Sequence, residues 1–248
     1  MSRGTSFTTD VGRRAAAEAV GTGLLLAAVV GSGIMGETLA GGNVAIALLA
    51  NAVATGAALV ALILTFGPVS GAHFNPAVTL ADAALGGIRW HEVPIYLVSQ
   101  VTGACLGVAA AHGMFERALF ELSTRARTGA PQLFSEFVAT FGLLSVIWGC
   151  VRSRPAAVPF AVGAYITAAY WFTASTSFAN PAVTLARSIT DTFSGIRPAD
   201  APGFIIAQLA GAAAATAFFR WLIPGRATIA DRVATPVSHP DHAPQEVG

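Results

Sequence analysis

The sequence predicts an all-α membrane protein with six transmembrane helices and two re-entrant half-helices, arranged as an inverted repeat. Three observations predict this fold. The 248 residues are 54% hydrophobic and 11% charged, with a mean hydropathy of +0.64, whereas a soluble domain carries about 25% charged residues. Six apolar stretches are long enough to cross a bilayer. The seven-residue sequence NPAVTLA occurs twice, beginning at Asn75 and at Asn180.

The predicted transmembrane helices are each close to the length of about 20 residues that crosses the hydrocarbon core. They cover Ala15–Gly36, Val44–Phe66, Val93–Gly113, Leu133–Cys150, Ala156–Ala174 and Ala201–Ile223. We assign them to one membrane domain at 13–224, made of a first repeat at 13–114, a connector at 115–131 and a second repeat at 132–224. Residues 1–12 are predicted to be an N-terminal tail, and the proline-containing residues 225–248 a disordered C-terminal tail.

Two semi-polar stretches, residues 67–90 and 175–200, separate the second span from the third and the fifth from the sixth. Each carries one NPAVTLA, and each is too apolar for an ordinary loop, which favours a re-entrant half-helix. Asn is a preferred N-cap and Pro is preferred at the first helical position. The motifs that start these half-helices are Asn75-Pro76-Ala77 and Asn180-Pro181-Ala182. Broken backbone at membrane depth is tolerated only where protein or a water-filled cavity covers it.

The two halves match beyond this motif. Glu18 in AEAVGTGLL corresponds to Glu136 in SEFVATFGL, and Gln100 in QVTG corresponds to Gln208 in QLAG. Because each repeat has three spans, the second repeat must enter the membrane inverted. We therefore expect the half-helices to meet near the midplane through their N-termini, where N–H groups are unpaired and the helix dipole is positive. Such a meeting point would line a polar path for neutral solutes.

Charge and composition exclude several function classes. The net charge is +1, all fourteen basic residues are Arg, and no basic patch with interleaved aromatics indicates nucleic acid. Cys105 and Cys150 form no disulfide or metal framework. No nucleophile–base pair, metal cluster or nucleotide loop indicates an enzyme, so we predict no cofactor and no metal. The positive-inside rule favours a multi-pass protein of the inner (plasma) membrane with both termini in the cytoplasm.

The duplicated motif and the matched Glu and Gln residues resemble the aquaporin and glycerol-facilitator family, the major intrinsic proteins. The resemblance covers roughly residues 13–223 and implies a homotetramer in the bilayer with one pore in each subunit. It also implies that five side chains support the re-entrant loops: Glu18, Glu136, His73, Gln100 and Gln208. A proton relay through the two glutamates is the alternative, because ionisable groups inside membrane spans are costly and usually functional.

Members of this family narrow the pore with a filter of four side chains, one of which is usually an Arg three residues after the second Asn. The matching residue here is Val183, and spacing from the motifs assigns Thr55, Ala168 and Ser177 to the other positions. This filter has no ring and no charge, which predicts a wide opening and a lower barrier to protons. The alternative is that Arg187, one helical turn after Val183, replaces the missing charge.

A Val at this position resembles the bacterial subgroup that is associated with arsenic-resistance operons. We therefore predict a passive channel for small uncharged solutes, with arsenous acid and methylated arsenicals favoured and glycerol, urea and water also conducted. An ordinary water or glycerol channel is one alternative, although glycerol-type members carry an Asp where this chain has Thr184. A proton-coupled secondary transporter that uses Glu18 and Glu136 is the other.

Overall fold

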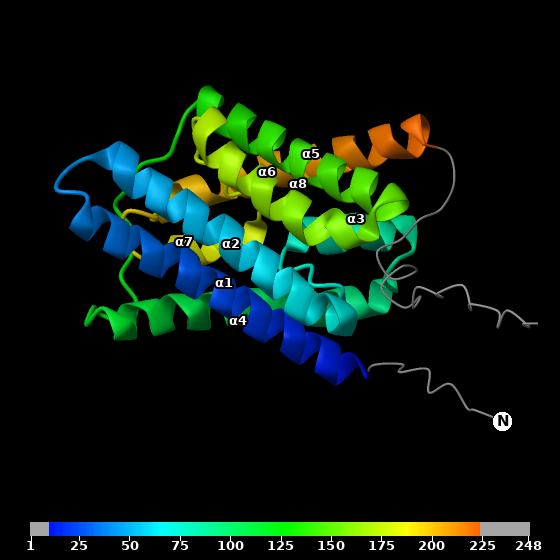
Figure 1. The fold of residues 1–248 in the computed structure, drawn as a ribbon, viewed down its shortest axis with the longest axis horizontal. Coiled ribbons are helices and arrows are strands. Elements are labelled where there is room, and N and C mark those ends of the chain that lie inside the picture. The colour runs from blue at the N-terminus through cyan, green and yellow to red at the C-terminus, as the bar shows by residue number, and fades with distance from the viewer. Residues whose placement is uncertain (1–9, 224–248) are drawn as a thin grey trace, which may run out of the picture.

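The computed structural model describes residues 10–223, which form helices joined by loops (Figure 1). Five helices in this part of the chain are long and apolar enough to cross a membrane. They are α1 (Val11–Leu39), α2 (Val44–Ser70), α4 (Val93–Met114), α5 (Ala130–Ser153) and α8 (Ala201–Leu222). The predicted C-terminal tail and nearly all of the predicted N-terminal tail lie outside the described residues.

The sixth predicted span is α6 (Val158–Phe172), which follows a 3₁₀ turn at Pro155–Ala157. At 1.5 Å per α-helical residue and about 2.0 Å per 3₁₀ residue, the two segments are together about 28 Å long. This length is close to the hydrocarbon thickness of about 30 Å. The helix ends two residues before the predicted boundary, and the predicted arrangement of six spanning helices with two half-helices is confirmed.

The two half-helices are α3 (Pro76–Leu85) and α7 (Pro181–Arg187), and each begins at the proline of a motif. Asn75 and Asn180 precede them in extended conformation, with φ of −153° and −158°. Each asparagine Oδ1 accepts a hydrogen bond of 2.9 Å from the backbone N–H of the motif alanine, Ala77 or Ala182. The side-chain cap and the proline at the first helical position together explain why both helices start here.

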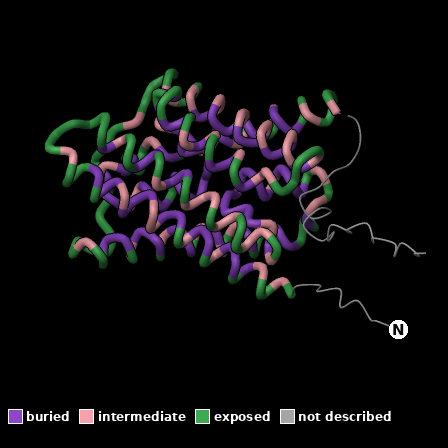
Figure 2. The backbone as a smooth tube through the Cα atoms, in the orientation of Figure 1, coloured by how far each residue is buried: buried purple, intermediate pink, exposed green. Residues whose placement is uncertain are grey.

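The repeats pack in the same way. In the first repeat α1 packs on α2 and α4, and in the second α5 packs on α6 and α8, while α2 against α6 joins the halves. The half-helices contact each other and lie against α4 and α8. Figure 2 shows that buried residues follow the inward sides of the helices, and most residues of both half-helices are buried.

Close helix crossings depend on glycines at matched places. A Cβ added at Gly103 or Gly107 on α4 would collide with carbonyl oxygens of α1, and one at Gly211 on α8 would collide with a carbonyl oxygen of α5. Small residues let backbones approach in this way, which is how helices associate in a bilayer that offers no hydrophobic driving force. Glycines therefore allow close packing of α1 on α4 in the first repeat and of α5 on α8 in the second.

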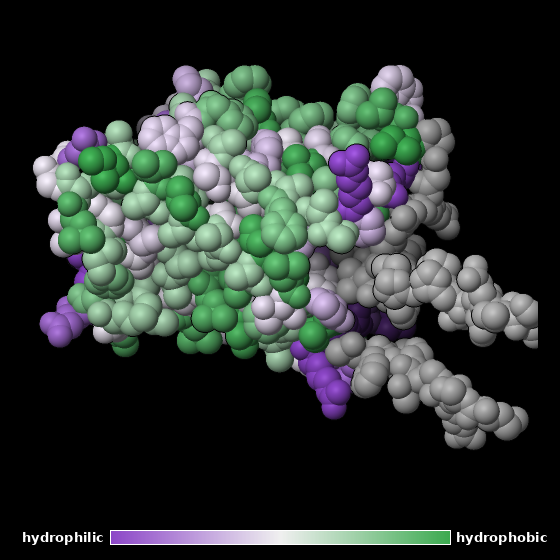
Figure 3. Space-filling view, viewed as in Figure 1, coloured by the Kyte–Doolittle hydropathy of each residue, from purple (hydrophilic) through white to green (hydrophobic). Residues whose placement is uncertain are grey.

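The outer surface is apolar between its two ends. Figure 3 shows hydrophobic side chains over the middle of the visible face, with hydrophilic residues gathered toward the ends. Large exposed apolar side chains come from several different helices, among them Leu24, Ile46, Val98, Leu106 and Ile206. Such a continuous apolar surface suits contact with lipid chains. The chain is accordingly built as a multi-pass membrane protein.

Candidate functional site

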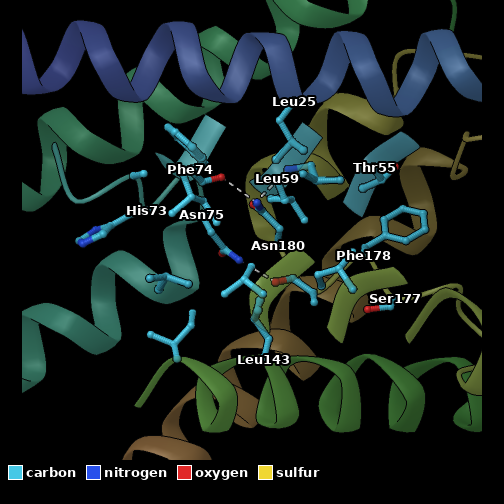
Figure 4. A pocket seen from close by; sticks show the side chains of 18 of the residues that line it. Leu25, Thr55, Leu59, His73, Phe74, Asn75, Leu143, Ser177, Phe178 and Asn180 are labelled. Carbon is cyan, nitrogen blue, oxygen red and sulfur yellow. Dashed lines mark hydrogen bonds between the residues drawn. The ribbon is translucent and has the colours of Figure 1, made fainter. Parts of the chain in front are cut away.

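The two asparagines cross-link the repeats where the half-helices meet. Nδ2 of Asn75 donates to the carbonyl of Ala179, and Nδ2 of Asn180 donates to the carbonyl of Phe74, both at 2.7 Å (Figure 4). Since each amide carries two N–H donors, one donor on each side remains for a molecule in the cavity that both side chains line. The meeting of the half-helix N-termini predicted above is therefore present in the structure.

The backbone that leads into each motif is strained. Ala72 and Phe74 before the first motif have φ of 49° and 50°, and Ser177 and Ala179 before the second have φ of 49° and 48°. Non-glycine residues in this left-handed region cost of order 1–3 kcal/mol each and persist only when their surroundings hold them. The loops therefore need a strong support, which buried carboxylates provide.

Glu18 supports the first loop from α1. Its Oε1 accepts from Ser70 Oγ at 2.6 Å and from the backbone N–H of His73 at 2.9 Å. Its Oε2 accepts from the backbone N–H of Phe74 at 2.7 Å and from Gln100 Nε2 at 2.8 Å. Four donors thus converge on the two oxygens of this carboxyl group, so one side chain can hold the strained segment.

Glu136 supports the second loop in the same manner. Its carboxylate accepts from the backbone N–H groups of Phe178 and Ala179, both at 2.9 Å, and from Gln208 Nε2 at 2.6 Å. Both glutamates are fully buried behind the loops, and neither is among the residues that line the cavity. Both therefore support the loops from outside the cavity.

Two threonines belong to this support and were missed by sequence reasoning. Gln100 Nε2 donates to Thr79 Oγ1 at 2.9 Å, and Gln208 Nε2 donates to Thr184 Oγ1 at 2.8 Å. Each threonine hydroxyl donates in turn to the carbonyl of its own motif asparagine, at 3.1 Å and 2.9 Å. The sequence did contain a signal, because both NPAVTLA copies have Thr at the position that makes these hydrogen bonds.

His73 lies at the end of the cavity away from Thr55 and Ser177 (Figure 4). Its Nδ1 is 3.1 Å from Thr79 Oγ1, and its Nε2 is 3.5 Å from a carboxylate oxygen of Asp82 on α3. Both ring nitrogens are thus directed at the first half-helix, so the ring braces α3 and adds a polar wall to the cavity.

The cavity has one apolar wall and one polar wall. The apolar wall comes from rows at helical spacing on α2, α5 and α6: Leu59 and Ile63, then Leu143, Ile147 and Val151, then Val158, Val162 and Ile166. The polar wall is formed by the loops and the two motif asparagines. The cavity volume is ≈ 90 Å³, whereas about 10–15 Å³ suffices for one water. The cavity therefore has room for several waters or for a small solute.

The predicted filter needs a correction at one position. Thr55, Ser177 and Val183 line the cavity, but Ala168 is exposed and does not. Tyr170 lines it instead, with its hydroxyl 3.2 Å from Thr55 Oγ1. The cavity face of α6 recurs every four residues and ends at Tyr170, so a residue two positions earlier points about 160° away from it at roughly 100° per residue. Counting residues back from Asn180 did not identify Tyr170, because the loop between α6 and the second motif is not helical.

The cavity is also lined by a ring and an arginine that the expected ring-free, uncharged filter does not include. Besides the Tyr170 ring, the cavity is lined by Arg187, whose side chain is buried. A second guanidinium, that of the half-buried Arg127 in the connector, also lies over the ring of Phe178. Burial lowers the pKa of Arg127 to about 10, which leaves it charged at neutral pH. Two arginines therefore lie close to the end of the cavity that Thr55 and Ser177 line.

Several known proteins are similar to this chain in sequence or in fold. The family model described as Major intrinsic protein matches the chain over residues 6–158 and 151–243. Aquaglyceroporin AqpS of Rhizobium meliloti (strain 1021) is 57% identical over 221 residues, 89% of this chain and 94% of that protein. Aquaporin NIP6-1 of Arabidopsis thaliana is 36% identical over 136 residues, 54% of this chain and 44% of that protein. The X-ray structure of the aquaglyceroporin from Plasmodium falciparum has a similar fold, with a TM-score of 0.66 and 20% identity, covering 85% of this chain and 96% of that one.

Proposed function

This chain belongs to the major intrinsic protein family, whose members are passive membrane channels for small solutes such as glycerol or water, and we propose that it conducts arsenous acid. Methylated arsenicals, glycerol, urea and water are the other proposed solutes, and each would move down its own gradient. The observation that carries the proposal is the cavity between an apolar wall and two facing half-helix N-termini, where Asn75 and Asn180 each keep a donor for a solute oxygen.

The cavity chemistry favours neutral solutes that carry hydroxyl groups. The positive ends of both half-helices point at the midpoint of the cavity and raise the energy of a cation there. The apolar wall replaces part of a hydration shell without offering polar partners, which penalises an ion more than a neutral molecule. A hydroxyl oxygen can accept from the Asn75 and Asn180 amides while the solute's less polar side faces α2, α5 and α6.

Arsenous acid fits this environment because it is uncharged near pH 7 and its three hydroxyl groups resemble those of a small polyol. Val183 supports this choice, since the family resemblance connects a Val here with arsenic-resistance operons. The position of the Asp found in glycerol-type members is occupied by Thr184, whose hydroxyl is committed to Asn180 and Gln208. We also propose a homotetramer in the inner membrane with both termini in the cytoplasm.

Reconstitution in proteoliposomes at pH 7 tests the function. We expect flux of arsenous acid, glycerol, urea and water above that of empty vesicles, proportional to the solute gradient and independent of a proton gradient. Flux equal to that of empty vesicles would rule out a channel. Flux that saturates and follows an imposed proton gradient would instead support the transporter that uses Glu18 and Glu136, although neither glutamate lines the cavity.

The substitution Val183→Arg tests the filter. Val183 is buried and lines the cavity, so a longer charged side chain would occupy part of the solute path. We expect arsenous acid and glycerol flux to fall about tenfold or more, while water flux is largely retained, because small steric differences in a pocket are worth about 1–3 kcal/mol. Stopped-flow light scattering measures both, with Val183→Ala as the control that keeps the position small. Unchanged selectivity in Val183→Arg would remove residue 183 from the filter.

A further inference from the structure

We propose that Arg187 supplies the guanidinium of the outer filter, from one helical turn beyond the usual position, and that with Ser177 it binds the oxygen atoms of passing solutes. The inference rests on the proposed channel function and deepens it. The ligand class is a small neutral solute with several hydroxyl or oxo groups. The same guanidinium adds a barrier to protons and cations beyond the one formed where the half-helix N-termini meet.

The local fold directs Arg187 back toward the cavity. It is the last residue of α7, and side chains on a helix lean toward the helix N-terminus. Its Nε donates to the carbonyl of Ser194, in the segment that returns past the helix end. Its guanidinium carbon lies 3.4 Å from the centre of the Phe178 ring. One hydrogen bond and one stacking contact thus hold the group in place.

Two polar atoms at this end of the cavity lack partners. Arg187 Nη1 and Ser177 Oγ are buried, and neither has a hydrogen-bond partner within residues 10–223. Both residues line the same cavity as Thr55 and Tyr170. A buried donor without a partner is costly, so an oxygen atom in the cavity, from water or from a solute, is the partner that the geometry provides.

The charge of Arg187 is not neutralised by an ion pair. In the described part of the chain, no carboxylate lies within ion-pair distance of this guanidinium. The carboxylate of Glu136 is nearby, but it is occupied by the loop N–H groups and Gln208. A net positive charge therefore stands at the end of the cavity lined by Thr55 and Ser177, where it repels protons and cations. This reverses the low proton barrier expected from the sequence.

Arg127 shows what a purely structural guanidinium looks like beside the same ring. Its guanidinium carbon is 5.0 Å from the centre of Phe178. Its Nε donates to the carbonyl of Gly195 at 2.8 Å and its Nη1 to the carbonyl of Ser175 at 3.1 Å. Arg127 is not among the cavity residues. Of the two, Arg187 is the one that has both a free donor and access to solute.

The test compares Arg187→Gln and Arg187→Lys with the unmodified chain in proteoliposomes. Arg187→Gln should raise proton and small-cation conductance at least about tenfold, because it removes the fixed charge from a low-dielectric constriction. It should also raise the flux of a five-carbon polyol relative to water. Arg187→Lys should keep the cation barrier but lose the solute preference, since it retains the charge without the planar fork of donors.

Arg125→Gln is the matched control. Arg125 is exposed and pairs with Glu37 at 2.8 Å, so this change removes one positive charge near the same end without touching the cavity. It should leave every flux unchanged. If Arg125→Gln leaks as much as Arg187→Gln, a general surface field explains the barrier and the inference is wrong.

Retained water flux shows that a variant is folded. If Arg187→Gln folds and has the same proton conductance and the same solute profile as the unmodified chain, the inference is wrong but the channel function stands. Should Arg187→Gln fail to fold, the solute profile of Arg187→Lys decides the question alone. An unmodified chain that is no more permeable than empty vesicles would overturn the proposed function and this inference together.

Discussion

Replacing Glu136 by alanine should abolish solute flux and lower the thermal unfolding temperature. The substitution leaves the N–H groups of Phe178 and Ala179 and one N–H of the Gln208 amide without an acceptor. Each buried donor left unpaired costs about 1–3 kcal/mol, and the strained backbone before the second motif loses its support. The measurements are thermal unfolding in detergent and stopped-flow flux in proteoliposomes. The equivalent change Glu18→Ala removes four such contacts and should have at least as large an effect.

Two further variants sharpen this result. Glu136→Gln keeps one carbonyl oxygen as an acceptor, so it should retain part of the flux, whereas a proton-coupled transporter would lose coupling completely. Glu37→Ala removes an exposed glutamate that, within residues 10–223, pairs with Arg125, and it should change neither the unfolding temperature nor the flux. Normal unfolding and normal flux in Glu136→Ala would contradict the assigned supporting role.

The substitution Asn180→Asp should turn a barrier to cations into a cation path. The amide hydrogen that bonds the Phe74 carbonyl at 2.7 Å would be replaced by a carboxylate oxygen, which cannot donate. The new negative charge would lie where the positive ends of both half-helices meet. At about 4 Å and an effective dielectric constant of about 20, an opposite unit charge stabilises a cation by about 4 kcal/mol. We expect proton and sodium conductance to rise strongly and neutral-solute flux to fall.

Asn43→Asp is the control for this change. Asn43 caps α2 in the exposed turn after α1, where its Oδ1 accepts from two backbone N–H groups. Aspartate caps helices as well as asparagine does, and Asn43 is not among the residues that line the cavity. Ion conductance in vesicles with an imposed potential is the readout. An Asn180→Asp variant that stays tight to protons would show that the midpoint is not where cations are rejected.

Features that depend on local sequence were predictable. Hydropathy and length identified the spanning helices, because burial in lipid requires about 20 apolar residues whatever the neighbours are. Asn-Pro identified the first turn of each half-helix, since capping uses only residues within one turn. The matched Glu and Gln pairs pointed to the residues that hold the loops. Thr79 and Thr184 escaped because a threonine inside a helix has many ordinary explanations.

Only the tertiary structure shows which side chains line the cavity near Thr55 and Ser177. The sequence by itself determined the membrane fold, its duplication and the facing half-helices, because hydrophobic length, helix caps and repeat symmetry are properties of short segments. It did not determine that Tyr170 rather than Ala168 faces the cavity, or that Arg187 reaches back to it. Those outcomes depend on the rotation of α6, the path of a non-helical loop and a ring against which a guanidinium stacks. All three are set by packing between residues that are distant in the chain.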